Sequence, residues 1–168
     1  MMSLNAAKEN MEFDDIFLIL LEDETPDYSF GIIKKIDNKR IGILRLYDID
    51  NVNKRANIQI ILEDYDEKAL YYKQGVISLM KIAFKELNLE KICYQRIDKE
   101  VISNRIVQQM RFISEGFLRQ QIFEDGKWHG INLRSVLKCE AERFHFKDEY
   151  ARALCRDRLD FNWRDIRV

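Results

Sequence analysis

The chain has 168 residues and a mass of 20.2 kDa, which is the size of a single domain. Its 28 Lys and Arg nearly balance its 29 Asp and Glu. The resulting net charge of −1 disfavours nucleic-acid-binding proteins, because these usually carry a basic excess toward the phosphates. Ten Phe, seven Tyr and two Trp exclude a chain that is mainly disordered.

Neither a membrane segment nor a metal site is expected. The longest strongly apolar run, residues 16–21, is far shorter than the ~20 residues that a helix needs to cross a membrane. Residues 1–10 lack the apolar stretch and basic flank of a secretion signal. The three Cys lie far apart without paired spacing, and only two His are present. These features predict a cytoplasmic protein with reduced thiols.

The secondary structure of the N-terminal segment, before the turn at residues 25–27, allows two interpretations. Residues 6–23 predict a helix that ends at Thr25-Pro26-Asp27, although a short apolar run such as residues 16–21 also fits a strand. The runs 30–36 and 40–46 flank a short polar turn and predict a β-hairpin. Residues 55–62 predict a third strand.

The second half alternates helices and strands. Residues 67–87 place apolar side chains on one helical face, residues 91–97 read as a buried strand, and residues 101–112 as a shorter helix. Residues 116–123 and 128–137 flank an Asp-Gly turn, which is a strong hairpin signal. From residue 140 the chain becomes charged and is predicted to be helical to about residue 158.

This order predicts an α+β fold with a mixed, mostly antiparallel sheet and helices on both faces. We expect one domain over residues 1–168, with a core at 30–138 and a C-terminal helical extension at 139–168.

Four stretches in this order resemble the GNAT superfamily of acyl-CoA N-acetyltransferases, in particular its ribosomal-protein-alanine acetyltransferase branch. They are Arg40-Ile41-Gly42 through Asp50, Lys54 through Ile58, Ala83 through Ile92, and Glu115-Gly116 through His129. The resemblance implies a GNAT-type sheet, shortened at its N-terminus. It also implies transfer of an acetyl group from acetyl-CoA to an amine, either a protein N-terminus or a small amine.

The resemblance further implies where the coenzyme binds. Backbone N–H groups near Ile60, Ile61 and Leu62 would face the thioester carbonyl. Ser103 and Asn104 would contact the pantetheine arm, although Ser103 is more readily explained as a residue at the start of a helix. The remaining coenzyme-binding candidates are Lys68, Tyr71 and Lys73.

The phosphate-binding loop of the family departs from its pattern in this chain. An ungapped alignment places Glu67 at the leading basic or polar position and puts Leu70 and Tyr72 at the two glycine positions. We therefore expect weakened acetyl-CoA binding, because large side chains obstruct the phosphates and a carboxylate repels them. The Tyr that often protonates the thiolate is replaced by Val107, and the Asn at the start of that helix by Glu100.

Two carboxylates, Glu63 and Asp64, follow the third strand where the family often places a general base. Capping of the strand end is the more ordinary interpretation. His129, beside the Asp-Gly turn, is expected to serve packing or a dimer contact. Near-zero net charge and a tail rich in Phe and Trp predict a homodimer. The alternative function is a non-catalytic GNAT-fold module that has lost coenzyme A binding.

Overall fold

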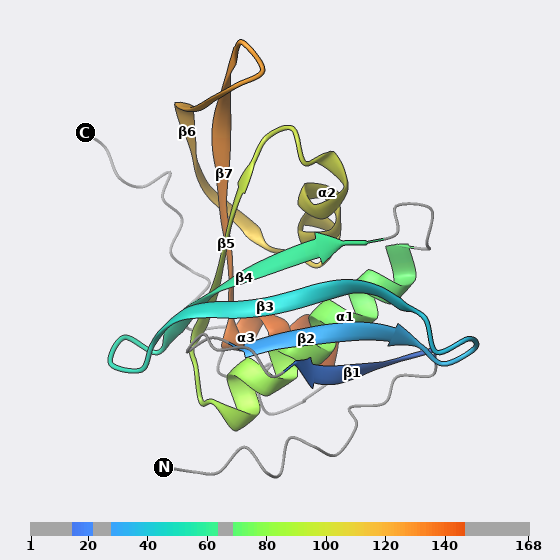
Figure 1. The fold of residues 1–168 in the computed structure, drawn as a ribbon. Helices are drawn as coiled ribbons and strands as arrows, with labels where there is room; N and C mark the ends of the chain where they lie inside the picture. Colours follow the sequence, from blue (N-terminus) through green and yellow to red (C-terminus); the bar gives the residue numbers. More distant parts are fainter. Residues whose placement is uncertain (1–14, 22–27, 64–68, 147–168) are drawn as a thin grey trace.

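A computed structural model describes residues 15–21, 28–63 and 69–146 (Figure 1). Seven strands form one sheet in the order β1-β2-β3-β4-β5-β7-β6. All neighbouring strands are antiparallel except β4 and β5, which are parallel. The predicted α+β fold with a mixed, mostly antiparallel sheet is therefore confirmed.

The strands follow the sequence closely. Their bounds are β1 Ile16–Leu21, β2 Tyr28–Lys34, β3 Arg40–Asp50, β4 Arg55–Leu62, β5 Lys91–Ile97, β6 Ile113–Glu124 and β7 Lys127–Leu137. The helices are α1 Ala69–Lys81, which continues into the π-helical η2 Ile82–Glu86, then α2 Val101–Gln109, α3 Lys138–Ala141 and the π-helical η3 Glu142–Phe146. None of the helices in these described ranges is long and apolar enough to span a membrane.

The prediction of a helix over residues 6–23 is wrong in the part that the structure describes. Residues 16–21 form strand β1, the alternative interpretation, and pair with β2 from Ile16↔Lys34 to Leu21↔Ser29. Ile16 and Leu18 are buried while Ile19 is 44% exposed, so the run alternates with the period of a strand. The rest of the predicted helix lies outside the described residues, as does the predicted C-terminal helix beyond residue 146.

The hydrophobic core lies between the sheet and its helices. One cluster of buried side chains joins Leu44 and Ile58 of the sheet to Leu79 of α1, Val107 of α2 and Ala141 of α3. These three helices therefore pack on the same face of the sheet. The predicted placement of helices on both faces is therefore not met in the described part of the chain. No helix there covers the opposite face, where the β3 and β4 side chains are half-buried (Arg45, Tyr47, Asn57, Gln59, Ile61).

Two glycines bring α1 close to the sheet. An added Cβ at Gly75 of α1 would lie 3.0 Å from Leu44 Cδ1, and one at Gly42 of β3 would lie 2.6 Å from the Ile61 carbonyl oxygen. Tyr72 of α1 packs beside Gly42 and donates a hydrogen bond of 2.8 Å from its hydroxyl to the Ile41 carbonyl. The position of α1 is thereby tied to the ends of β3 and β4.

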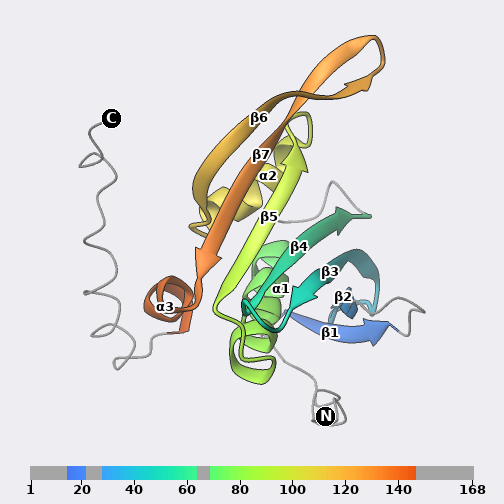
Figure 2. The same ribbon diagram turned by 90° about the vertical axis from the view of Figure 1, so that its left-hand side faces the viewer.

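The β6–β7 hairpin projects beyond the body of the sheet (Figure 2). β6 is an edge strand, and eleven of its twelve residues are exposed. Several of its large apolar side chains are more than a third exposed, as is Trp128 of β7 (Ile113, Phe117, Leu118, Ile122, Phe123). This hairpin therefore offers an uncovered apolar surface.

Candidate active site

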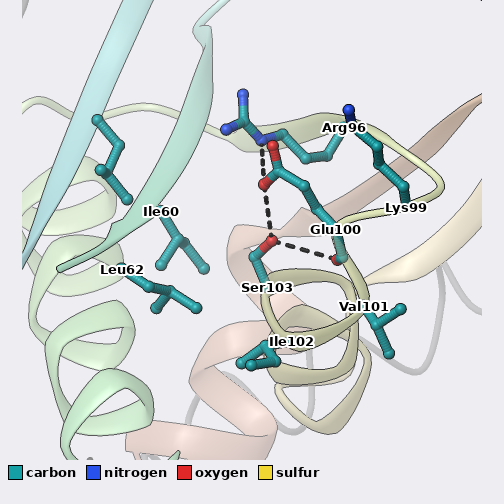
Figure 3. Close-up of a pocket in the computed structure, with 9 residues that line it drawn as sticks. Ile60, Leu62, Arg96, Lys99, Glu100, Val101, Ile102 and Ser103 are labelled. Carbon is teal, nitrogen blue, oxygen red and sulfur yellow. Dashed lines mark hydrogen bonds and ion pairs between the residues drawn. The ribbon is translucent and has the colours of Figure 1, made fainter. Parts of the chain in front are cut away.

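A groove of about 540 Å³ lies between the C-terminal end of β4 and the N-terminal end of α2 (Figure 3). It exists because β4 and β5 separate. Their pairing runs from Arg55↔Lys91 to Ile58↔Tyr94, and the last four residues of β4 continue beyond it. β3 still pairs with this end of β4 as far as Gly42↔Leu62, so the groove side of β4 is held in an extended conformation.

One wall of the groove consists of Ile60, Ile61 and Leu62 of β4. Ile60 is buried, and the other two side chains are half-buried. Since strand β5 has diverged, the backbone groups of this segment that point away from β3 face the groove rather than a neighbouring strand. This wall can accept an extended ligand that hydrogen-bonds like an added strand.

The other wall comes from the end of β5 and the start of α2, and it is polar. Arg96 Nε donates a hydrogen bond of 2.7 Å to Glu100 Oε2, and the Ser103 hydroxyl lies 3.2 Å from the same oxygen. The Ser103 hydroxyl also lies 3.4 Å from the Glu100 carbonyl oxygen. Figure 3 shows this network facing Ile60 and Leu62 across the groove. Lys99, Val101 and Ile102 complete the lining.

Behind this wall, Tyr94 of β5 is fully buried. Burial raises the pKa of its phenol to about 12, and the neighbouring Ser103 hydroxyl acts in the opposite direction. The phenol is therefore uncharged at neutral pH. Asn104 of α2 is not part of the groove lining, and its Nδ2 donates a 3.0 Å hydrogen bond to the Ile97 carbonyl.

The structure brings together four of the coenzyme-binding residues expected from the sequence, namely Ile60, Ile61, Leu62 and Ser103. Tyr71 and Lys73 lie half-buried at the start of α1, and are not part of the groove lining. Lys68 and Asp64 lie outside the described residues. Glu63 is exposed and its Oε2 pairs with Arg40 Nε at 2.8 Å, also outside the groove lining.

The sequence interpretation missed Arg96 and Lys99, and treated Glu100 only as a departure from the family. The sequence did offer one signal for these residues. Arg96 at the end of a buried strand and Glu100 at the start of a helix have opposite charges and are spaced i, i+4. The predicted obstruction of the phosphate loop by Tyr72 is also wrong. Tyr72 is 1% exposed and points into the core, while Leu70 of the same helical turn is 51% exposed.

No cluster of three or more His, Cys, Asp or Glu able to hold a metal ion occurs in the described ranges. His145 of η3 lies apart from the groove, and its Nε2 is 3.0 Å from the Met110 carbonyl oxygen. Burial holds the pKa of this imidazole below its usual value. Cys93 of β5 is a free thiol whose pKa is raised by burial, so it is a weak nucleophile at neutral pH.

Comparisons with known proteins point to one kind of enzyme. The chain is 31% identical over 98 residues to spermidine N(1)-acetyltransferase of Escherichia coli, covering 57% of this chain and 52% of that protein. It is 26% identical over 107 residues to "Putative ribosomal N-acetyltransferase YdaF" of Bacillus subtilis, covering 63% and 58% respectively. The chain thus spans between half and three-fifths of these relatives. No family model matches it.

Solved structures give the same fold. The spermidine N-acetyltransferase of Vibrio cholerae, solved in complex with CoA and spermine, superposes with a TM-score of 0.63 at 19% identity, over 70% of this chain and 69% of that one. The non-catalytic alternative is not favoured, because the relatives are named as enzymes. Assignment to the ribosomal-protein-alanine branch stays a prediction. The resemblance to the GNAT superfamily is confirmed, and the chain has the fold of the GNAT N-acetyltransferases.

Proposed function

We propose that the chain transfers an acetyl group from acetyl-CoA to an amine, and that the groove between β4 and α2 binds the acetyl-pantetheine arm. The observation that carries this proposal is the separation of β4 from β5 beyond Ile58↔Tyr94. It leaves a strand edge beside a groove of about 540 Å³, where an extended amide-containing chain can pair with the backbone.

In the proposed reaction the acceptor nitrogen attacks the thioester carbonyl carbon, the C–S bond breaks, and coenzyme A leaves as a thiolate. Within Ile60 to Leu62, the backbone N–H groups of Ile60 and Leu62 point away from β3 and stabilise the negative charge on the carbonyl oxygen. Most of the acceleration comes from holding amine and thioester together, which is worth up to roughly 7–11 kcal/mol in well-oriented reactions. The attacking nitrogen gives its proton to a carboxylate, Glu63 or Asp64. Water protonates the thiolate, because the position of the usual Tyr is occupied by the buried Val107.

The coenzyme phosphates are proposed to bind at the start of α1. This helix has thirteen residues and no acidic side chain in its first turn, so the positive end of its dipole favours an anion. It follows β4 in the chain and lies on the same side of the sheet as α2 (Figure 1). Lys68, Tyr71 and Lys73 are the candidates for supporting contacts. Binding is proposed to be weak, because Glu67 opposes the phosphates.

Two classes of acceptor amine are proposed, a small polyamine and a protein N-terminus. The named relatives suggest both, since one is a spermidine acetyltransferase and another is named for ribosomal acetylation. Glu63 and Asp64 are the carboxylates proposed to receive the proton of the amine. Glu63 would first have to leave its ion pair with Arg40.

The test is an acetylation assay with matched tryptophan variants. The full chain is incubated with acetyl-CoA and either spermidine or a peptide with a free α-amino group, and thiol release and acceptor mass are followed. Val101→Trp fills the groove from an exposed position on α2, whereas Val52→Trp alters an exposed turn at the other end of β4. We expect Val101→Trp alone to abolish transfer. Transfer that survives in Val101→Trp, or is absent from the wild type with both acceptors, would overturn the proposal.

A further inference from the structure

Hydrogen bonds connect the β6–β7 hairpin to the turn between β5 and α2, which leads into the polar wall of the groove. Asp98, directly after β5, makes three hydrogen bonds to β7. Its backbone N–H donates to the Gly130 carbonyl at 3.0 Å, its Oδ2 accepts from the Gly130 N–H at 3.1 Å, and its Oδ1 lies 3.0 Å from His129 Nδ1. Both carboxylate oxygens and the backbone are thus engaged with one strand.

A second contact ties the next residue to the other strand of the hairpin. Lys99 Nζ lies 2.5 Å from Glu124 Oε2 at the end of β6. Lys99 is also part of the groove lining, and its carbonyl accepts a hydrogen bond from the Val101 N–H at the start of α2. The hairpin therefore holds the two residues that immediately precede Glu100 and the first turn of α2.

We infer that Asp98 is a positioning residue for the acetyl-CoA groove, and that with His129 and Gly130 it fixes the wall formed by Lys99, Glu100 and Ser103. This inference rests on the proposed function. Asp98 does not line the groove, so it acts through the residues that follow it. A displacement of about 1 Å in a wall of this kind can cost up to ~100-fold in a positioned reaction, even when the altered residue touches no ligand.

The hydrogen-bond geometry explains why a carboxylate is required. Asp98 accepts from His129 on one oxygen and from the Gly130 N–H on the other. Both contacts hold the pKa of the Asp98 carboxyl below its usual value. An amide keeps one acceptor oxygen for the Gly130 N–H, but its NH2 group can bond His129 Nδ1 only if the imidazole moves its own proton to Nε2, while Ala could satisfy neither partner.

The experiment compares acetyl-CoA affinity and thermal stability in matched variants of the full chain. Asp50 is the control, since its carboxylate also accepts two backbone N–H groups and pairs with Arg55, but in the β3–β4 turn at the far end of β4. By calorimetry we expect Asp98→Ala to raise the Kd for acetyl-CoA about tenfold and Asp98→Asn to give an intermediate loss. We expect Asp50→Ala to stay within about twofold of the wild type, even if both Ala variants lose similar melting temperature.

If Asp98→Ala does not fold, His129→Leu provides the same comparison, because it removes one contact and leaves both Asp98–Gly130 bonds. An unchanged Kd in a folded Asp98→Ala or His129→Leu variant would overturn the positioning role while leaving the proposed function intact. A Kd that rises equally in Asp50→Ala would reduce Asp98 to a general stability residue and overturn it as well. A wild type that does not bind acetyl-CoA would refute the proposed function and the inference together.

Discussion

Substitution of Gly42 by Ala tests how the groove wall is supported. The added Cβ would lie 2.6 Å from the Ile61 carbonyl oxygen and 3.0 Å from Tyr72 Cε1. Neither neighbour can move freely, since the first is strand backbone and the second belongs to a buried ring anchored by its hydrogen bond to Ile41. The strain must therefore shift β4 at Ile61, which lines the groove.

The expected cost is that of overpacking a filled core, about 2 kcal/mol. For a chain of this size that corresponds to a loss of roughly 4–8 °C in melting temperature. Gly116→Ala is the control, because its added Cβ would meet only Leu133 Cδ1 at 3.8 Å, an ordinary contact. Melting is followed by circular dichroism, and the Kd for acetyl-CoA by titration. Equal melting temperatures and equal Kd values for Gly42→Ala and Gly116→Ala would show that the close approach at Gly42 does not support the groove wall.

Three further predictions concern stability and assembly. Tyr72→Phe should lower the free energy of unfolding by about 1 kcal/mol in urea titrations, which is the typical net contribution of one hydrogen bond. The loss should be no larger, because the Ile41 carbonyl keeps its hydrogen bond from the Glu63 N–H. No measurable loss would contradict the buried placement of this hydroxyl. Burial lowers the folded-state pKa of His145, so the unfolded chain binds more protons just below pH ~6.5, and stability should fall there as the pH decreases. His145→Gln should flatten this decline in melting curves between about pH 5 and 7.5, and an unaltered decline would exclude His145 as its source. Finally, we expect the full chain to form a homodimer through the exposed apolar side chains of the β6–β7 hairpin. Phe123→Ser should weaken the dimer in light scattering. A strictly monomeric wild type would refute the homodimer.

Much of the fold could be predicted because local signals agreed with the tertiary structure. The β4 bounds at residues 55–62 and the β5 bounds at 91–97 coincide with the predicted strands, and the Asp-Gly turn at Asp125-Gly126 lies in the hairpin where it was expected. Each of these segments carries its own pattern of apolar alternation or turn chemistry. β1 was mistaken for part of a helix because six apolar residues fit either period, and only pairing with β2 decides between them.

The site was less predictable because its parts come from separate elements. Ile60 to Leu62 and Ser103 could be proposed from the family resemblance, but the roles of Arg96 and Lys99 depend on where β5 diverges from β4. The burial of Tyr72 could not be predicted from the sequence either, since a Tyr in the first turn of a helix can face the phosphates or the core. His129 gave no sequence signal of its contact with Asp98, 31 positions away.

Calorimetric titration of the full chain with acetyl-CoA measures whether the groove between β4 and α2 binds this coenzyme. We predict saturable one-to-one binding toward the weak end of the ~1 μM–1 mM range typical of enzyme substrates. We also predict that Val101→Trp prevents this binding and that Val52→Trp does not. An absence of saturable binding at millimolar acetyl-CoA, or identical binding by the two tryptophan variants, would contradict the assignment of the groove between β4 and α2 as the acetyl-CoA site.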